Sequence, residues 1–227
     1  LQVGHVDEVA SFCQMKNAPK GFKVVMASPD RAMTILRSLQ GSGKGASKLF
    51  AKSNVVPTGV QYGPGFSEAD RRVKYPHETV NAILGNAAFV QMQTDAQNLI
   101  DGIVVTLSTE LDLNPSDFIH IPILFEQDAA SGLFIAYNPG SVNMLHLTKA
   151  DRTARVCVPR PFGPVSGNVD RFARDILDSL GPTSLTGVEV KFIDDFVDYH
   201  VLSGEIHCGT NSKRKPRTDL WWWHFQP

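Results

Sequence analysis

The order in which strand-like and helix-like segments follow one another constrains the fold of this chain most strongly. An apolar run at residues 22–27 is typical of a short buried strand, and Ser28 and Pro29 follow it at once. Serine is a preferred N-cap residue and proline suits the first helical position, so a helix is predicted to begin there. That helix carries one apolar face, made by Ala32, Ile35, Leu36 and Leu39.

This alternation continues along the whole chain. Helical spacing returns over residues 76–112 and 168–180, while residues 55–75 are rich in glycine and proline and are predicted to form a loop. Further extended structure is predicted at residues 1–12, 118–125, 132–137, 142–147, 154–158, 188–193 and 197–207. Strand pairs separated by single helices favour a mixed α/β fold built of repeated units, although no repeat is visible as sequence identity.

Composition excludes several classes of partner. The 227 residues contain 22 lysines and arginines against 23 aspartates and glutamates, so the charge gives no reason to expect a nucleic acid or a membrane surface as partner. Three scattered cysteines do not suggest a disulfide framework and fit a reducing compartment, which predicts a cytoplasmic protein. Because the chain begins on Leu1 inside an apparent motif, we expect it to be a piece of a longer protein.

A Gly-Ser-Gly-Lys run at residues 41–44 invites comparison with a phosphate-binding loop. That motif needs a glycine where this chain has Ser38 and a serine or threonine where it has Gly45. It also follows a strand, whereas a helix is predicted here. The run is therefore interpreted as a flexible connection after the helix.

Cys208 is the candidate nucleophile of the chain. It lies in residues 204–208, predicted to be extended, where successive side chains alternate between two faces. This alternation turns His207 away from Cys208, so the distant His5 is the better candidate for its acid/base partner. Asp7 is expected on the same face as His5. A cysteine, a histidine and an aspartate fit both a cysteine protease and an amidinohydrolase, and composition alone does not distinguish them.

Five short sequences make the assignment more specific. They are residues 4–8 (GHVDE), 142–145 (VNML), 159–164 (PRPFGP), 204–211 (GEIHCGTN) and 214–216 (RKP). In this order and spacing they resemble the catalytic domain of the peptidylarginine deiminases. The tryptophans at 221–223 with the final proline are similar to the end of that family. The resemblance covers almost the whole chain, so residues 1–227 are expected to be the C-terminal part of such a domain.

The resemblance implies a fold and a reaction. The fold would be a pentein, an α/β propeller of ββαβ modules around the active site, present here as an incomplete ring. Cys208 would attack the guanidinium carbon of an arginine side chain and form a thiouronium intermediate. His5 would protonate the leaving ammonia and then activate water, and Asp7 would bind the guanidinium group in a charge-assisted pair.

The chain also departs from the family pattern. The second guanidinium-binding carboxylate and the ligands of the calcium cofactor are expected upstream of Leu1, so the isolated chain is expected to be inactive. An Arg-His pair that holds the substrate backbone in some members is replaced by Leu202 and Ser203. Free arginine therefore stays a candidate substrate beside arginine-containing proteins.

Other chemical residues have simpler interpretations. Cys13 and Cys157 are expected to be small buried hydrophobes, and the cluster of Asp194, Asp195 and Asp198 is expected to be a solvated turn. Zinc at His207 and Cys208 is disfavoured, because neighbours on opposite strand faces do not share one ion readily. The tryptophans are expected to seal a core.

Two hypotheses from different classes remain. The first is a calcium-dependent protein-arginine deiminase with Cys208, His5 and Asp7 in its active site. The second is a non-catalytic pentein chain that binds arginine-bearing partners, or that assembles with a complementary chain or as a homodimer.

Overall fold

The computed structural model describes residues 5–15, 18–51, 78–129, 131–148, 154–181, 188–196 and 198–211. The predicted loop at 55–75, the basic residues at 214–216 and the tryptophans at 221–223 lie outside these residues.

The first of two three-stranded sheets lies in the N-terminal half. Strand β1 (Ala10–Gln14) pairs antiparallel with β2 (Phe22–Ser28), and β2 pairs in parallel with β3 (Phe118–Pro122). The described residues between β2 and β3 include α1 (Pro29–Gly41), α3 (Val80–Gly85), α4 (Ala87–Glu110) and the 3-10 helix η2 (Pro115–Asp117).

The second three-stranded sheet has the same connectivity. Strand β6 (Leu145–Thr148) pairs antiparallel with β7 (Ala154–Pro159), and β7 pairs in parallel with β10 (Glu189–Ile193) after the helix α5 (Arg171–Leu180). In both sheets a hairpin is followed by helical structure and then by a parallel strand. Two antiparallel pairs complete the strands, namely β4 (Phe125–Gln127) with β5 (Phe134–Ala136), and β8 (Val165–Ser166) with β9 (Val169–Asp170).

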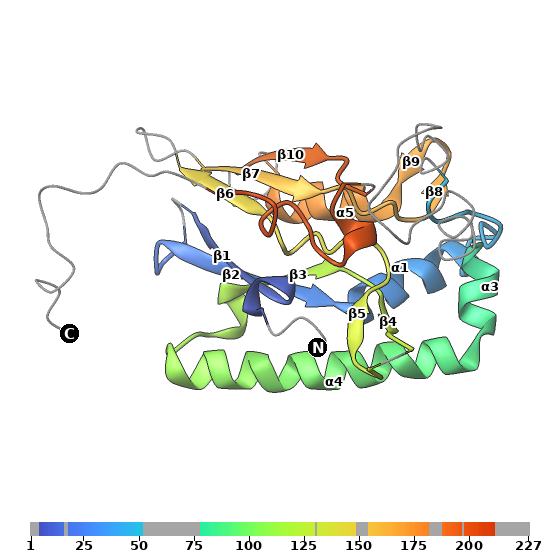
Figure 1. Cartoon of the computed structure of the whole chain (residues 1–227), viewed down its shortest axis with the longest axis horizontal. Coiled ribbons are helices and arrows are strands. Elements are labelled where there is room, and N and C mark those ends of the chain that lie inside the picture. Colours follow the sequence, from blue (N-terminus) through green and yellow to red (C-terminus); the bar gives the residue numbers. More distant parts are fainter. Residues whose placement is uncertain are drawn as a thin grey trace, which may run out of the picture.

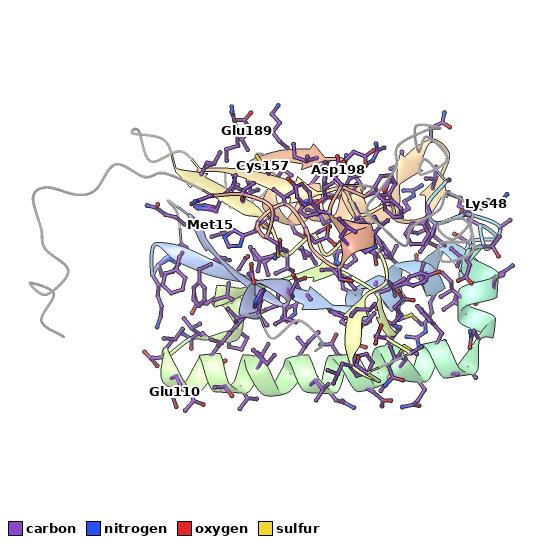
Figure 2. The ribbon with its side chains drawn as sticks, viewed as in Figure 1. Met15, Lys48, Glu110, Cys157, Glu189 and Asp198 are labelled. Atoms are coloured by element: carbon purple, nitrogen blue, oxygen red, sulfur yellow. The ribbon has the colours of Figure 1, made fainter. Side chains whose placement is uncertain are left out.

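The protein is thus a mixed α/β structure with several small sheets, none of which closes on itself among the described residues. Figure 1 shows α4 beneath the β1–β2–β3 sheet, with β6, β7 and β10 on the other side. The labelled side chains of Glu110 on α4 and Glu189 on β10 lie on opposite sides of the molecule in Figure 2. Helix α5 packs against both β3 and β10, so it joins the two sheets.

The helices begin where short polar side chains cap them. The Oγ of Ser28 accepts the Arg31 backbone N–H at 3.1 Å, which confirms the predicted cap of α1. The helix predicted over 76–112 is interrupted at Asn86, whose side chain caps α4 by accepting the Phe89 N–H at 3.1 Å. These bonds satisfy backbone donors that have no partner inside the helix.

Two apolar clusters form the core. The larger one joins β1, β2 and β3 to α4, α5 and the second sheet. The smaller one is rich in aromatic rings and packs around α1. Within it, the Phe196 ring lies 5.3 Å from that of Phe162 and 5.2 Å from that of His200. Phe196 therefore anchors the segment that leads to Cys208 in the apolar interior.

Three predicted extended segments have a different structure. Residues Val6–Glu8 form a 3-10 helix, η1, so the strand predicted at 1–12 begins only at Ala10. The strand predicted at 142–147 begins only at Leu145. Residues 197–207 contain a short 3-10 helix, η3 (His200–Leu202), and the chain then turns repeatedly up to Gly209. Tertiary contacts explain why η1 and the turn after η3 are not extended, because the Asn143 side chain, described below, bonds to both segments.

Within the described residues, no helix combines the length and the apolar character that crossing a membrane requires.

Candidate active site

The candidate site joins the two ends of the described chain. One side is η1, which supplies Asp7 and Glu8. The other is the turn after η3, which supplies His207 and Cys208. This turn is held by its own backbone, since the Gly209 N–H donates to the Glu205 carbonyl at 3.1 Å and the Thr210 N–H to the His207 carbonyl at 3.2 Å.

Asn143 connects these two sides. Its Oδ1 accepts the backbone N–H of His207 at 3.0 Å and that of Cys208 at 3.3 Å. Its Nδ2 lies 2.9 Å from Asp7 Oδ2, 3.2 Å from Cys208 Sγ and 3.3 Å from Glu8 Oε1. One fully buried amide therefore brings the cysteine sulfur and two carboxylates together.

Asp7 and His207 form the second link between the two sides. The His207 Nδ1 lies 2.6 Å from Asp7 Oδ2, and the two side chains are 51% and 23% exposed. The pair is open to solvent on the histidine side, so the ring is accessible to an incoming molecule.

The environment of Cys208 raises the pKa of its thiol. Burial raises the pKa of the thiol, and the nearby charge of Glu8 raises it further. Hydrogen bonds from the Glu205 backbone and from Asn143 act in the opposite direction and lower that pKa. The Cys208 Sγ lies 3.4 Å from Glu8 Oε1, and burial raises the pKa of the Glu8 carboxyl as well. The empty site therefore opposes the thiolate, which a bound cation would favour.

Two buried acidic residues, Glu205 and Asp195, lie beneath the turn that carries Cys208. Glu205 is 2% exposed, and its Oε1 accepts the Gly140 N–H at 2.8 Å and lies 2.8 Å from His200 Nδ1. Burial raises the pKa of the Glu205 carboxyl to about 8. The pKa of Asp195, also 2% exposed, rises to about 8, because burial and then the charge of Glu205 disfavour its ionised form. We infer that the pair keeps one proton at neutral pH.

Of the three predicted site residues, Asp7 and Cys208 meet at one side chain, whereas His5 lies at the exposed end of η1. Asp7 and Cys208 both reach the Asn143 amide, from segments that are far apart in the chain. His5 is exposed at the N-terminal end of η1, where its charge lowers the pKa of Glu8.

The strand argument that separated His207 from Cys208 is wrong. Both residues lie in a turn, and their side chains reach neighbouring carboxylates, His207 that of Asp7 and Cys208 that of Glu8. The argument that placed Asp7 on the face of His5 by strand alternation fails for the same reason, because η1 is helical.

Sequence reasoning missed three residues of the site. Asn143 belongs to the recognised 142–145 sequence, but nothing in that sequence indicated that its amide would reach Cys208. Glu8 directly follows the recognised Asp7 and gave a signal that was not used. The expectation that the acidic cluster at 194–198 is solvated is wrong for Asp195, which is buried, and agrees with the exposed Asp194 and Asp198.

The other two cysteines differ from each other. Cys13 is fully buried, as predicted, and burial raises the pKa of its thiol to about 12. Cys157 on β7 is only partly buried, so the prediction of a buried hydrophobe is wrong for this residue. Figure 2 shows Cys157 in the sheet of β6, β7 and β10.

The residues that the structure describes do not offer a metal site. Among them, no group of three or more histidine, cysteine, aspartate or glutamate side chains is placed to hold an ion. The ligands of the calcium that the resemblance implies are expected upstream of Leu1, and no step of the chemistry is derived through a metal.

Comparison with known proteins decides the family. The model of the protein-arginine deiminase family matches residues 1–224. The chain belongs to the protein-arginine deiminase family. The deiminase resemblance of the short sequences is thereby confirmed over nearly the full length.

Named relatives agree with this membership. The chain is 36% identical to rat protein-arginine deiminase type-3 over 230 residues, which cover 100% of the chain and 30% of that protein. It is 33% identical to mouse type-4 over 230 residues, with the same coverage of both chains. It is 31% identical to human type-1 over 224 residues, which cover 98% of the chain and 29% of that protein. The chain thus spans less than a third of the length of these deiminases.

The buried pair of Asp195 and Glu205 should make stability depend on pH. A carboxyl whose pKa is raised by folding keeps a proton that the unfolded chain releases, so stability falls as pH rises from the ordinary carboxyl range to about 8. For one proton the slope is roughly 1.4 kcal/mol per pH unit. We expect Asp195→Asn to flatten this slope and to be the more stable protein at pH 8, as measured by urea unfolding.

The matched control is Asp194→Asn, which changes the exposed neighbour of Asp195. Its stability should follow that of the unaltered protein at every pH. Parallel curves for Asp195→Asn and the unaltered protein would show that Asp195 itself retains no proton.

Proposed function

We propose that the protein containing this chain converts arginine side chains of proteins to citrulline and releases ammonia. The observation that carries the proposal is that, in a chain of the deiminase family, Cys208 Sγ and the Asp7 carboxylate meet at one amide. A nucleophile beside a carboxylate is the arrangement that attack on a bound guanidinium requires.

The negative charge of the site suits a guanidinium group. Asp7 and Glu8 are adjacent to Cys208 through the Asn143 amide. A guanidinium cation presents donors in a plane and pairs with carboxylates through two parallel hydrogen bonds. Asp7 binds it along one edge, so that a face of the planar group meets the sulfur. The bound cation also offsets the Glu8 charge that raises the thiol pKa.

The proposed reaction has two halves. The Cys208 thiolate forms a C–S bond with the guanidinium carbon, a C–N bond breaks, and the departing nitrogen takes a proton from His5 and leaves as ammonia. Water then gives its proton to His5 and forms a C–O bond with the thiouronium carbon. The C–S bond breaks, which returns the thiolate, and the remaining hydroxyl proton passes to ammonia or the solvent, which leaves neutral citrulline.

His207 is a second candidate for the acid/base in this scheme. Its Nδ1 lies 2.6 Å from Asp7 Oδ2, and it is the sequence neighbour of the nucleophile. A carboxylate that pairs with one ring nitrogen fixes the orientation of a histidine and leaves the other ring nitrogen to transfer protons. His5 is supported by the family resemblance, whereas His207 is supported by this contact.

We propose that the chain is part of a pentein ring and corresponds to the C-terminal part of the catalytic domain. The repeated order of hairpin, helix and parallel strand in the two three-stranded sheets supports the ββαβ module. Three further expectations remain predictions, namely the calcium requirement, a cytoplasmic location, and a complementary chain or second copy as partner.

Cys208→Ser should abolish turnover, because a serine hydroxyl is a much weaker nucleophile than a thiolate at neutral pH. Binding of an arginine peptide should persist, since Asp7 and Glu8 are unchanged. The measurement is mass spectrometry of the one-dalton change from arginine to citrulline, with and without calcium. Citrulline formation by the Cys208→Ser protein would contradict the assignment of the nucleophile.

His5→Ala and His207→Ala should distinguish the two candidate bases. Loss of the residue that transfers protons should lower kcat by roughly 100-fold or more and remove one limb of the pH–rate profile. Loss of the other histidine should leave the shape of that profile intact. Retention of both limbs in each variant would mean that neither histidine is the acid/base.

Leu202 and Ser203 stand where some family members have an Arg-His pair that holds the substrate backbone. A comparison of free arginine with a blocked arginine amide therefore tests whether the site recognises a peptide backbone. Leu202 is 56% exposed and offers no hydrogen-bonding side chain to a peptide backbone. Because the proposed substrate is an arginine side chain within a protein, we expect a blocked arginine amide to be converted with a higher kcat/KM than free arginine, although the missing Arg-His pair narrows the difference. The reverse order would favour a small-molecule deiminase over a protein-modifying enzyme.

A further inference from the structure

Asn143 makes more contacts within the candidate site than its place in a recognised sequence explains. It is fully buried, and its amide faces the backbone of the Cys208 turn on one side and three acceptors on the other. The orientation of the amide is fixed, because two backbone N–H groups point at one of its ends and that end must be the oxygen. The nitrogen end therefore faces Cys208.

The segment around Asn143 is held rigidly. The Asn143 N–H donates to the Gly140 carbonyl at 2.8 Å, and its own carbonyl accepts the His207 N–H at 3.3 Å. The Ser11 Oγ donates to the Val142 carbonyl at 2.7 Å, and the Ser141 Oγ to the Pro159 carbonyl at 2.9 Å. A donor fixed in this way needs no reorganisation when charge develops on the sulfur.

The amide nitrogen has two hydrogens for three acceptors. Asp7 Oδ2 is the nearest at 2.9 Å, while Cys208 Sγ and Glu8 Oε1 at 3.2 and 3.3 Å compete for the second hydrogen. A thiolate is an acceptor without a proton of its own, so ionisation of Cys208 moves this competition in favour of the sulfur.

We propose that Asn143 is a catalytic residue of the reaction above, because its Nδ2–H donates to the Cys208 thiolate while the same amide fixes the guanidinium-binding Asp7. This inference rests on the proposed function for the identity of the reaction, but the state of the sulfur can be measured without turnover. It extends the site beyond the three residues that the sequence indicated.

The groups around the Cys208 sulfur change the pKa of its thiol in opposite directions. Glu8 raises the pKa of the Cys208 thiol, whereas Asn143 and the Glu205 backbone lower it. Asp7 and His207 lie on the other side of the Asn143 amide, and His5 lies near Glu8. Removal of Asn143 and removal of the Glu8 charge should therefore have opposite effects on one measurable quantity.

The test is the pH dependence of alkylation of Cys208 by iodoacetamide, with each cysteine followed separately by peptide mass spectrometry. The thiolate attacks the iodoacetamide carbon, a C–S bond forms and iodide leaves, so the rate reports the thiolate fraction. Cys208 is exposed and open to the reagent. We expect Asn143→Ala to raise the apparent pKa by about one unit, which slows alkylation at neutral pH about tenfold.

A second variant separates donation to the sulfur from support of the turn. Asn143→Asp keeps an oxygen for the backbone N–H groups of His207 and Cys208 but replaces the donor with a third carboxylate oxygen. We expect it to raise the thiol pKa at least as far as Asn143→Ala. Glu8→Gln should lower the thiol pKa, because it removes the adjacent negative charge.

Ser141→Ala is the matched control. It removes a buried hydrogen bond in the same segment without touching the sulfur, so the Cys208 pKa should stay unchanged. Cys13 reports the fold in every variant, because this fully buried thiol is protected from the reagent as long as the core is intact.

The thiol pKa measurements test the role of Asn143, whereas citrulline formation tests the proposed reaction. A raised thiol pKa in Asn143→Ala, with Ser141→Ala unchanged and Cys13 still protected, supports the role of the donor. An unchanged pKa in Asn143→Asp would overturn it, even if Asn143→Ala raises the pKa, because only the turn would then depend on Asn143. Absence of citrulline from the longer protein that contains this chain, assayed with calcium, would instead contradict the proposed reaction and would leave the thiol result standing.

Discussion

The arrangement of the site depends on one buried carboxyl group. Glu205 accepts the Gly140 N–H and lies against His200, and these contacts attach the turn that carries Cys208 to the loop before Asn143. A carboxyl group in an apolar interior is costly unless its polar atoms are paired or it is neutral. Its pKa of about 8 indicates the second solution, in which Glu205 and Asp195 share the proton. The turn is thereby fixed before any substrate binds.

Asn143 connects this fixed turn to the Asp7 carboxylate and the Cys208 sulfur. Its backbone is bonded to Gly140, and its side chain meets the turn on one side and η1 on the other. The two halves of the site thus meet at an amide whose own position is set by the loop that Glu205 holds. A flexible lysine or arginine in this place would lose more side-chain entropy in holding the same geometry.

The pKa of the Cys208 thiol depends on the charges beside it. Without a cation, burial and Glu8 raise the pKa of the Cys208 thiol and so disfavour the thiolate, which is its reactive form. A planar cation beside Asp7 and Glu8 reverses this balance locally. In the reaction proposed above, these negative groups would attract the substrate and, in its absence, disfavour the thiolate of Cys208.

Much of the secondary structure followed from local patterns. The strand at Phe22–Ser28 and its capped helix were predicted because Ser28 and Pro29 act on their immediate neighbours. Strands β7 and β10 and helix α5 were also close to their predicted ranges, because their apolar periodicity is strong. The two ends of the site were predicted wrongly as extended, since alternation of polar and apolar residues in a short segment does not exclude a turn.

By itself, the sequence determined the α/β class, the family and two members of the site, Asp7 and Cys208, because these depend on local propensity and on recognisable short sequences. Only the tertiary structure decided that η1 is helical, that His207 contacts Asp7, and that Asn143 lies between the nucleophile and the carboxylates. It also decided that Asp195 is buried while Asp194 is exposed. The physical reason is that hydrogen bonds between segments as far apart as residues 7 and 207 depend on how the chain packs, which no local pattern records.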